Sequence, residues 1–418
     1  MGASDALRAL VALGALAGAS TLAACFFELS DVVPAGADAG VTTSGSGGSG
    51  TGGSGGGTTT TTSGSGGGIP ADWWNTKWTR RVKLVLDNAT GGAVTDFPLL
   101  VTLDATRIDY GATRDDASDL RFVAEGGVVL AHEVDRWDEA GISHVWVRVP
   151  SIPASGTGEV WLYFGNVDAT DAQDASSLWS AYAAVYHLGN DPTAGGAAMA
   201  DSTGHGHDGT PIGIALADRV EGRVGQAIHF AGVATDAPRV ALTEDGGAFD
   251  AEPGGGMSFE VWAKREPSAS DMFVMMNEGC CEGTAVLFAG TPTLSATFAT
   301  KSGNCCNTTN YAYADAPWSD GDTDWHYLAV VFDRAAGSMK VFVDGTVGAE
   351  QPIPTNLASA ATATMNIGTD WSGASGMKGV LDEARFASGP LSADYVDAQQ
   401  RSMTDQMIDY RPIEQLPQ

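Results

Sequence analysis

The clearest structural signal in the chain is the stretch Met257-Ser-Phe-Glu-Val-Trp-Ala-Lys264. Its odd-numbered residues are all apolar, and polar residues occupy most of the even positions. Successive side chains of a strand point to opposite faces, so this alternation predicts a β-strand with one well-defined inner face. Farther on, Leu328-Ala-Val-Val-Phe332 is an unbroken apolar run, which is typical of a central strand buried on both sides. These two strands predict an all-β domain over residues 183–403.

Two shorter features support the same domain. Asp344-Gly345 fits a tight turn between the strands of a hairpin. Ser392–Met403 is the one helical candidate, because Ser392 can cap the helix and Asp394 suits its first turn. The residues that follow, 404–418, are expected to form a C-terminal tail.

Alternation with period two also dominates residues 69–170. Turn signals such as Asn88-Ala-Thr-Gly-Gly92 separate the short apolar segments, and no convincing helical segment lies between them. Short strands at regular spacing predict an antiparallel β-sandwich. The strand candidates are Val82–Leu86, Phe97–Leu103, Leu120–Ala124, Val129–Trp137, His144–Val149 and Val160–Phe164.

The C-terminal domain resembles the LamG-like, concanavalin A-like jelly rolls. The resemblance implies a jelly-roll fold whose loops contact glycans or proteins. It rests on a series of motifs in order: Tyr186-His-Leu188, Asp201-Ser-Thr-Gly-His-Gly-His-Asp-Gly-Thr210, Gly222–Phe230, Met257–Lys264, Trp325–Asp333, Met339–Val343, Asn366-Ile-Gly368 and Gly379–Phe386.

The N-terminal sandwich resembles a bacterial surface family of unknown function, number 2341, that often accompanies LamG-like domains. The segments that carry the resemblance include His132-Glu-Val-Asp-Arg-Trp137, Val145-Trp-Val-Arg-Val-Pro150 and Val160-Trp-Leu-Tyr-Phe-Gly-Asn166. The resemblance implies a non-catalytic β module.

The N-terminus resembles a bacterial lipoprotein signal. An apolar run from Leu7 to Leu22 leads into Leu22-Ala-Ala-Cys25, and a Gly/Ser/Thr-rich tract follows. The pattern predicts a signal peptide over residues 1–24 and acylation of Cys25, which would anchor the protein to a membrane. Phe26, in place of Asp after Cys25, favours the outer membrane of the cell envelope. Residues 25–68 have too few apolar groups to fold and are expected to form a disordered tether. An ordinary signal peptide, with Cys25 incidental, is the alternative.

The charge of the chain excludes one large class of partners. Lys and Arg total 22 and Asp and Glu total 51, so the net charge is −29. Such an acidic surface repels phosphate backbones, so we expect no nucleic-acid binding.

Calcium is the metal that the jelly-roll resemblance implies, as a structural ion on the outer face. The resemblance places Asp382 near the loop that holds Asp201 and Asp208, and Ca²⁺ prefers carboxylate and carbonyl oxygens. A plain turn capped by these aspartates is an equally weighted alternative. His205 and His207 could ligate zinc, but four ligands are usual for a structural zinc site and no others are evident.

Four cysteines form two doublets, Cys280-Cys281 and Cys305-Cys306. Adjacent cysteines rarely pair with each other, because the ring is strained. In an oxidising compartment the two doublets are expected to form disulfides with each other. A zinc site made of four thiolates is the alternative.

The favoured hypothesis for function is a surface-anchored binding or adhesion module for glycan or protein ligands, without catalytic residues. Trp371 and Trp318 are candidate ligand contacts, since tryptophan offers a stacking face, and core packing is their alternative. Glu133, Asp135 and Asp138 resemble the spaced carboxylates of a β-glucanase, although a solvated edge strand is the favoured interpretation. A carbohydrate-active hydrolase and a purely structural envelope protein are the other hypotheses.

Overall fold

The computed structural model describes most of the chain after residue 69. The described residues are 70, 72–88, 91–233, 235–242, 248–249, 254–267, 272–277, 283–288, 293–299, 311–319, 321–355, 365–370 and 373–417. Residues 70–416 form one compact unit. Within the described part, no helix is both long and apolar enough to cross a membrane.

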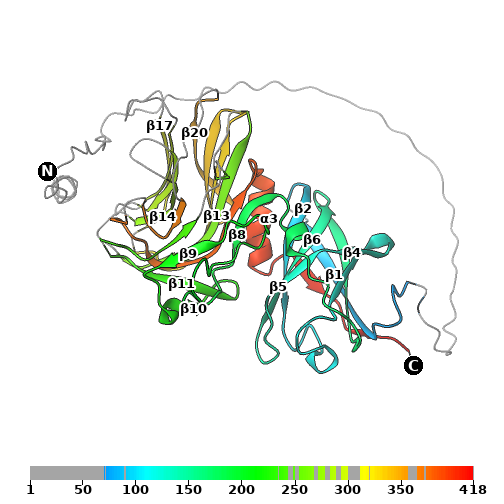
Figure 1. Ribbon diagram of the computed structural model, residues 1–418. Helices are drawn as coiled ribbons and strands as arrows, with labels where there is room; N and C mark the ends of the chain where they lie inside the picture. Colours follow the sequence, from blue (N-terminus) through cyan, green and yellow to red (C-terminus); the bar gives the residue numbers. More distant parts are fainter. Residues whose placement is uncertain are drawn as a thin grey trace, which may run out of the picture. The chain divides into compact units, whose positions relative to one another are not determined.

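An antiparallel β-sandwich forms the N-terminal part of this unit, as predicted (Figure 1). Its two sheets enclose a core that includes Leu84, Phe97, Phe122 and Leu162, all buried. One sheet has the order β23-β1-β7-β3-β4, with β24 also paired to β1, and the other has the order β2-β6-β5. The bounds are β1 (Arg80–Asn88), β2 (Val94–Leu103), β3 (Arg121–Ala124), β4 (Val128–Leu130), β5 (His132–Arg136), β6 (Ser143–Ile152), β7 (Gly156–Phe164), β23 (Ile408–Tyr410) and β24 (Glu414–Gln415).

The strand predicted over Val129–Trp137 is in fact two strands. β4 pairs with β3 in one sheet, and β5 pairs with β6 in the other, so the chain changes sheets at Ala131. Alternation continues through the change, which is why the sequence pattern did not reveal it. As a result, Glu133 and Asp135 lie at the edge of the smaller sheet.

The C-terminal part consists of two further antiparallel sheets, as expected of a jelly roll (Figure 1). One sheet has the order β10-β11-β22-β13-β18-β19-β20, with β8 paired to β22, and the other has the order β17-β16-β15-β14-β21-β12-β9. The bounds are β8 (Tyr182–Tyr186), β9 (Gly209–Ile212), β10 (Arg219–Glu221), β11 (Gln226–Ala231), β12 (Arg239–Leu242), β13 (Gly256–Arg265), β14 (Met272–Asn277), β15 (Gly283–Phe288), β16 (Thr293–Ala299), β17 (Tyr311–Pro317), β18 (Trp325–Asp333), β19 (Ser338–Val343), β20 (Thr346–Pro352), β21 (Met365–Ile367) and β22 (Lys378–Ala387).

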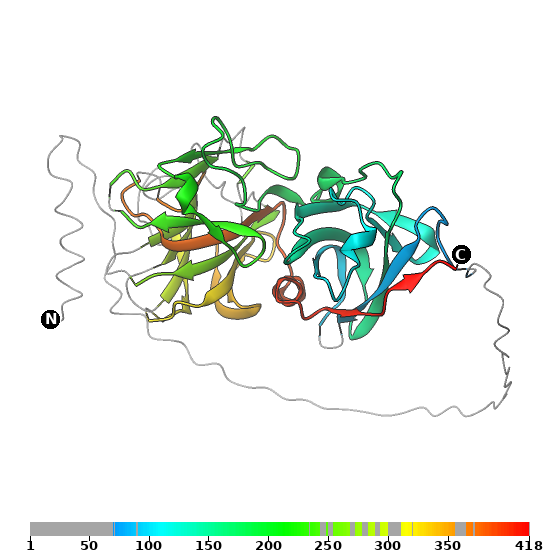
Figure 2. The same cartoon turned by 90° about the horizontal axis from the view of Figure 1, so that it is seen from below.

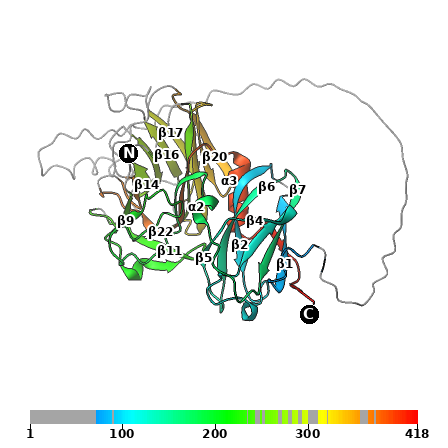
Figure 3. The same cartoon turned by 45° about the vertical axis from the view of Figure 1, so that its right-hand side comes forward.

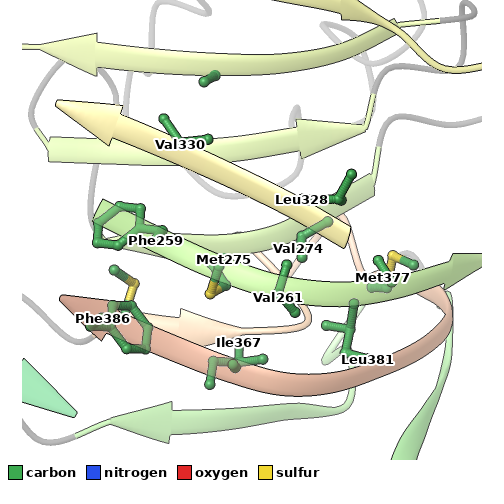
Figure 4. Packing of buried hydrophobic residues seen from close by; sticks show 14 of the residues in the cluster. Phe259, Val261, Val274, Met275, Leu328, Val330, Ile367, Met377, Leu381 and Phe386 are labelled. Carbon is green, nitrogen blue, oxygen red and sulfur yellow. The ribbon is translucent and has the colours of Figure 1, made fainter. Parts of the chain in front are cut away.

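The strands predicted from Met257–Lys264 and Leu328–Phe332 lie next to each other as β13 and β18. Figure 4 shows Phe259 and Val261 with Leu328 and Val330 among the buried side chains of the jelly-roll core. Asp344 and Gly345 have positive φ angles (50° and 77°) and join β19 to β20, which confirms the predicted hairpin.

Short helices complete the described structure. α3 (Ala393–Met403) is the predicted helix, and the Ser392 hydroxyl caps it by accepting a hydrogen bond from the amide of Tyr395 (3.1 Å). α2 (Ala175–Leu178), labelled in Figure 3, joins the sandwich to β8. The 3₁₀ turns are Tyr110–Ala112, Glu125–Gly127 and Leu216–Asp218.

A separate apolar cluster joins the two β structures. Leu100 and Trp146 of the sandwich pack with Trp179, which follows α2, and with Trp262 and other residues of the sheet that holds β13, β18 and β22. α3 contacts the sandwich through polar bonds as well, because the Ser402 hydroxyl accepts the Leu100 amide (2.9 Å). Each β structure therefore covers apolar surface of the other.

The C-terminal residues return to the sandwich. β23 pairs antiparallel with β1, from Leu84 opposite Tyr410 to Leu86 opposite Ile408. Figure 2 shows this C-terminal strand, drawn in red, beside the strand drawn in blue. The segment expected to be a tail thus supplies strands to the first domain.

Candidate functional site

A β-bulge in β22 creates the main cluster of charged side chains. Glu383 has a positive φ angle of 52°, and the pairing register with β13 shifts between Glu260 and Trp262, opposite this position. A bulge places an extra residue on one strand and re-aims its side chain. Leu381 before the bulge and Ala384 after it both belong to the jelly-roll core, so Glu383 lies on the other face with Arg385.

His187, directly after β8, is bracketed by two carboxylates. Its Nδ1 lies 2.8 Å from Glu383 Oε1, and its Nε2 lies 3.2 Å from Glu133 Oε2. Glu133 comes from β5 of the sandwich, so the histidine links both β structures. Glu383 Oε2 also accepts hydrogen bonds from Arg385 Nε (3.1 Å) and Nη2 (2.5 Å).

Aromatic rings surround these charges. The Arg385 guanidinium lies over the rings of Trp146 (4.2 Å) and Trp179 (5.0 Å). Trp146 also stacks on His187, with 6.2 Å between ring centroids and 16° between planes. The indole Nε1 of Trp179 donates to Glu133 Oε2 (2.6 Å). Such packing excludes water and strengthens the charge–charge interactions.

The surroundings shift the pKa values of the two carboxyl groups of β5, Glu133 and Asp135, in opposite directions. Burial would raise the pKa of Glu133, but the charge of His187 and its hydrogen bond outweigh burial, so that pKa is lowered. Burial, together with the charges of Glu383 and Glu133, outweighs the opposing charge of His187 and raises the pKa of Asp135 to about 7. Near neutral pH Glu133 is ionised, whereas Asp135 is partly protonated.

The pKa values of His187 and Glu383 shift in opposite directions. Burial lowers the pKa of His187, yet Glu383, Glu133 and Asp135 together raise it well above its usual value. Burial raises the pKa of Glu383, but His187 and Arg385 bring it down to about 2. The pair is therefore an imidazolium and a carboxylate.

The turn between β10 and β11 covers this cluster. Asp382 Oδ2 accepts the amides of Arg223 (2.7 Å) and Val224 (2.8 Å). A Cβ atom at Gly225 would lie 2.6 Å from Asp135 Oδ2, so the turn needs glycine there. Asp135 and Asp382 thus lie beneath the same short turn, and burial together with Glu383 raises the pKa of Asp382 well above its usual value.

A pocket of about 430 Å³ opens beside the cluster. Carboxyl, amide, hydroxyl, imidazole and guanidinium groups dominate its lining. The lining residues are Glu133, Val134, Asp135, Arg136, His187, Gly189, Asn190, Ala200, Ser202, Arg219 and Gln226. One wall belongs to the sandwich and the other to the jelly roll. The Ser202 hydroxyl donates to Glu133 Oε1 (2.8 Å), so that carboxylate is fixed in the wall.

Three of the pocket and cluster residues could hold a metal ion. Within the described residues, one ligand atom each from Asp135, His187 and Glu383 lies within 4.8 Å of the others. This group shares no residue with the predicted calcium ligands.

The predicted calcium ligands lie in two places. Asp201 and Asp208 are joined, because Asp208 Oδ1 accepts the Asp201 amide (2.8 Å). The Asp201 carboxylate accepts the amides of Val185 (3.1 Å) and Thr203 (3.0 Å), as a capped turn does. Asp382 instead binds the β10–β11 turn. No hydrogen bond within the described part of the chain joins Asp382 to the other two aspartates.

The structure describes only some of the remaining predicted site residues. Trp318 is 3% exposed in the jelly-roll core, which matches its packing alternative and argues against direct ligand contact. His207 is buried, and its ring lies 6.3 Å from that of His205. The other predicted positions lie outside the described residues: Cys25, Cys280, Cys281, Cys305, Cys306 and Trp371.

For Glu133, Asp135 and Asp138 the sequence favours the interpretation of a solvated edge strand. The structure corrects this for Glu133 and Asp135, whose carboxyl groups line a pocket and interact with His187. Asp138 pairs with Arg136 (3.0 Å) instead. The same-face spacing of Glu133 and Asp135 was the available signal. His187 and Glu383 carried none, because their roles depend on a domain contact and a bulge.

Comparisons with known proteins match both parts of the chain. Residues 116–187 match the domain of unknown function DUF2341, and residues 238–397 match Laminin_G_3, described as the concanavalin A-like lectin/glucanases superfamily. No curated protein matches the chain. Glu133, Asp135 and His187 fall in the first segment, and Glu383 falls in the second.

Two solved structures illustrate the similarity of fold. Domain 4 of AbnA, a GH43 extracellular arabinanase from Geobacillus stearothermophilus, in complex with arabinotriose, is 20% identical, with a TM-score of 0.39; the match covers 52% of this chain and 96% of that one. The binding domain of Botulinum Neurotoxin DC in complex with SialylT is 8% identical, with a TM-score of 0.40, covering 55% and 52%. Similarity at these scores carries no functional argument. The chain thus carries a DUF2341 segment followed by a concanavalin A-like domain of the Laminin_G_3 type.

Proposed function

We propose that the protein is a binding module that takes up a glycan in the pocket between its two β structures. The observation that carries this proposal is the polar lining of that pocket. Most small-molecule sites are mainly apolar with a few polar groups, whereas this lining offers donors and acceptors on nearly every side. A ligand dense in hydroxyl groups satisfies such a lining best. The volume of about 430 Å³ lies within the roughly 300–1,000 Å³ of small-molecule sites.

The match to a lectin and glucanase superfamily supports a carbohydrate as the ligand class. Gln226 and Asn190 are the best residues for a test, because both line the pocket and neither belongs to the ion network around His187. Their amides can donate and accept hydrogen bonds to vicinal hydroxyls.

The test is a glycan array, followed by calorimetry on the best ligand, with the full chain carrying Cys25→Ser to prevent acylation. Gln226→Ala should weaken binding at least tenfold, since each lost hydrogen bond in a desolvated site costs about 1–3 kcal/mol. Gln351→Ala, at an exposed position of the edge strand β20, is the matched control and should bind normally. No glycan signal, or equal binding by both variants, would exclude the pocket as a glycan site.

We further propose that Cys25 is acylated and anchors the protein at the outer membrane. Support comes from the Leu22-Ala-Ala-Cys25 pattern and the tract behind it. Two or more acyl chains are needed for stable anchoring. Mass spectrometry of the N-terminal peptide should detect the acyl groups, and Cys25→Ser should move the protein from the membrane fraction to the soluble fraction.

We also propose, from the sequence pattern, that Ca²⁺ binds near Asp201 and Asp208. Adding Ca²⁺ to metal-free protein should then raise the melting temperature, because a ligand that binds only the folded state stabilises it. An unchanged melting temperature with and without Ca²⁺ would leave the capped turn as the role of these aspartates.

A second candidate function, glycoside hydrolysis, is favoured by the carboxyl pair of β5. Glu133 is ionised and Asp135 has a pKa of about 7, which is the division of roles that an acid–base pair requires. Release of reducing sugar that Asp135→Asn abolishes would support hydrolysis, and binding without any release would leave a binding module.

A further inference from the structure

Two carboxyl oxygens in the cluster around His187 lack partners within the described part of the chain, although the other carboxylates of the cluster have them. Glu133 and Glu383 are bonded to cationic or polar partners. The two oxygens in question, Asp135 Oδ2 and Asp382 Oδ1, are buried and have no hydrogen-bond partner among the described residues. Asp382 is fully buried and interacts electrostatically with Asp135 and Glu383. A buried carboxylate oxygen is unfavourable unless a donor or a cation compensates it.

We propose that Asp135, His187 and Glu383 bind a divalent transition-metal ion of the Zn²⁺ or Mn²⁺ class. One ligand atom from each lies within 4.8 Å of the other two, so a single ion can reach all three after small side-chain movements. Asp135 and His187 also line the open pocket, which gives the ion a path from solvent and leaves room for water ligands.

The orientation of His187 suits a metal ligand. Its Nε2 faces Glu133 Oε2 at 3.2 Å, and a metal-bound histidine usually donates its other ring N–H to a carboxylate. Metal binding would displace the proton of its Nδ1, which would then face the ion together with Glu383 Oε1, 2.8 Å away. Neighbouring ligands of an octahedral ion with bonds of about 2.1 Å are about 3.0 Å apart. Glu133 would serve as a positioning residue, itself held by Trp179 and Ser202.

The donor set selects the class of ion. Calcium prefers an all-oxygen shell, whereas one imidazole with two carboxylates suits zinc, manganese or ferrous iron. Asp382 lies outside the 4.8 Å group, and its carboxyl group interacts electrostatically with those of Asp135 and Glu383. Arg223 adds positive charge near Asp382, but its guanidinium lies over the ring of Trp262, 5.2 Å away, and not between the ligands. The site is thus distinct from the calcium predicted near Asp201.

This inference goes beyond glycan binding and does not depend on it, because metal binding can be measured without any glycan. The two proposals therefore fail separately. The same carboxyl group of Asp135 would be ionised with a metal bound, so occupancy by metal would also disfavour its role as a catalytic acid.

The test is equilibrium dialysis of the full chain carrying Cys25→Ser against Zn²⁺ or Mn²⁺, with metal content measured by mass spectrometry. We expect one ion per chain. Asp135→Asn keeps the size of the side chain but removes its charge, and should weaken binding at least tenfold. Asp168→Asn, at an exposed position, is the matched control and should bind as the parent does. Glu383→Gln is less suitable, because it would leave the buried guanidinium of Arg385 without its carboxylate partner.

A second measurement tests directly whether a nitrogen atom of His187 coordinates the metal ion. Mn²⁺-loaded protein should show nitrogen hyperfine coupling in pulsed electron paramagnetic resonance, and His187→Gln should abolish it. The proposal is overturned by the absence of stoichiometric Zn²⁺ or Mn²⁺ binding, by equal binding in Asp135→Asn and the parent, or by coupling that survives His187→Gln.

Discussion

Substitution of Met407 should destabilise the N-terminal sandwich, although this residue follows the jelly roll in the chain. Met407 is fully buried in the sandwich core, and its carbonyl accepts the amide of Asp87 (2.8 Å) at the edge of β1. Truncating a buried methionine to alanine costs about 2–5 kcal/mol, from lost transfer free energy and from the cavity left behind. That is a large part of the roughly 5–15 kcal/mol by which a domain is stable.

Deletion of residues 404–418 should cost more than Met407→Ala alone. It also removes β23, the hydrogen bond from the Thr102 amide to the Tyr410 hydroxyl (3.0 Å), and the ion pair between Arg107 and Asp405 (2.6 Å). The hydrogen bond adds about 1 kcal/mol and the partly exposed ion pair less than that.

Thermal unfolding followed by calorimetry measures the loss, and limited proteolysis with peptide mapping locates it. Met407→Ala should lower the melting temperature, and the first new cleavage sites should fall in residues 72–170. Gln406→Ala changes the exposed neighbour and should have little effect. Equal melting temperatures for the two variants, or first cleavage within the jelly roll, would refute the assignment of this segment to the sandwich core.

Two further predictions concern the jelly roll and its helix. The hydrogen bond to Asp344 (2.7 Å), together with Asp322, outweighs burial and raises the pKa of His326 to about 9, so the folded state holds a proton that the unfolded state releases near pH 6.5. This stabilisation, about 1–2 kcal/mol after solvent screening, is full below pH 6.5 and is lost as the pH rises to 9. His326→Asn should therefore lower the urea midpoint at pH 6 but hardly at pH 9.5, and a pH-independent effect would contradict this. Ser392→Ala should cost about 1 kcal/mol by removing the cap of α3, and Ser392→Asp should retain most of that stability; equal losses in both variants would show that capping is not the cause.

Local patterns account for the parts of the fold that were predicted. Met257–Lys264 and Leu328–Phe332 are strands because the alternation, or the continuous apolar run, matches how each strand is buried. The hairpin at Asp344-Gly345 and the cap at Ser392 depend on residues adjacent in sequence. Each of these features is decided within a few residues, so the sequence carries the necessary information.

The candidate site is different, because it is assembled from distant segments. Glu133 and Asp135 share a strand face, and that much is visible in the sequence. Their burial is not, because the jelly roll covers the edge that would otherwise be solvated. His187 reaches Glu133 only through the contact between the two β structures.

By itself the sequence determined the all-β class, the two β regions, the helix after the last jelly-roll strand and the strongly acidic charge, because composition and periodicity are local properties. Tertiary structure alone decided that β4 and β5 belong to different sheets, that residues 408–410 complete the first sandwich, and that the bulge at Glu383 turns its carboxylate toward His187. The physical reason is that strand pairing and bulges depend on which distant backbone supplies the partner hydrogen bonds. The charged site where the two β structures meet exists only once those partners are in place.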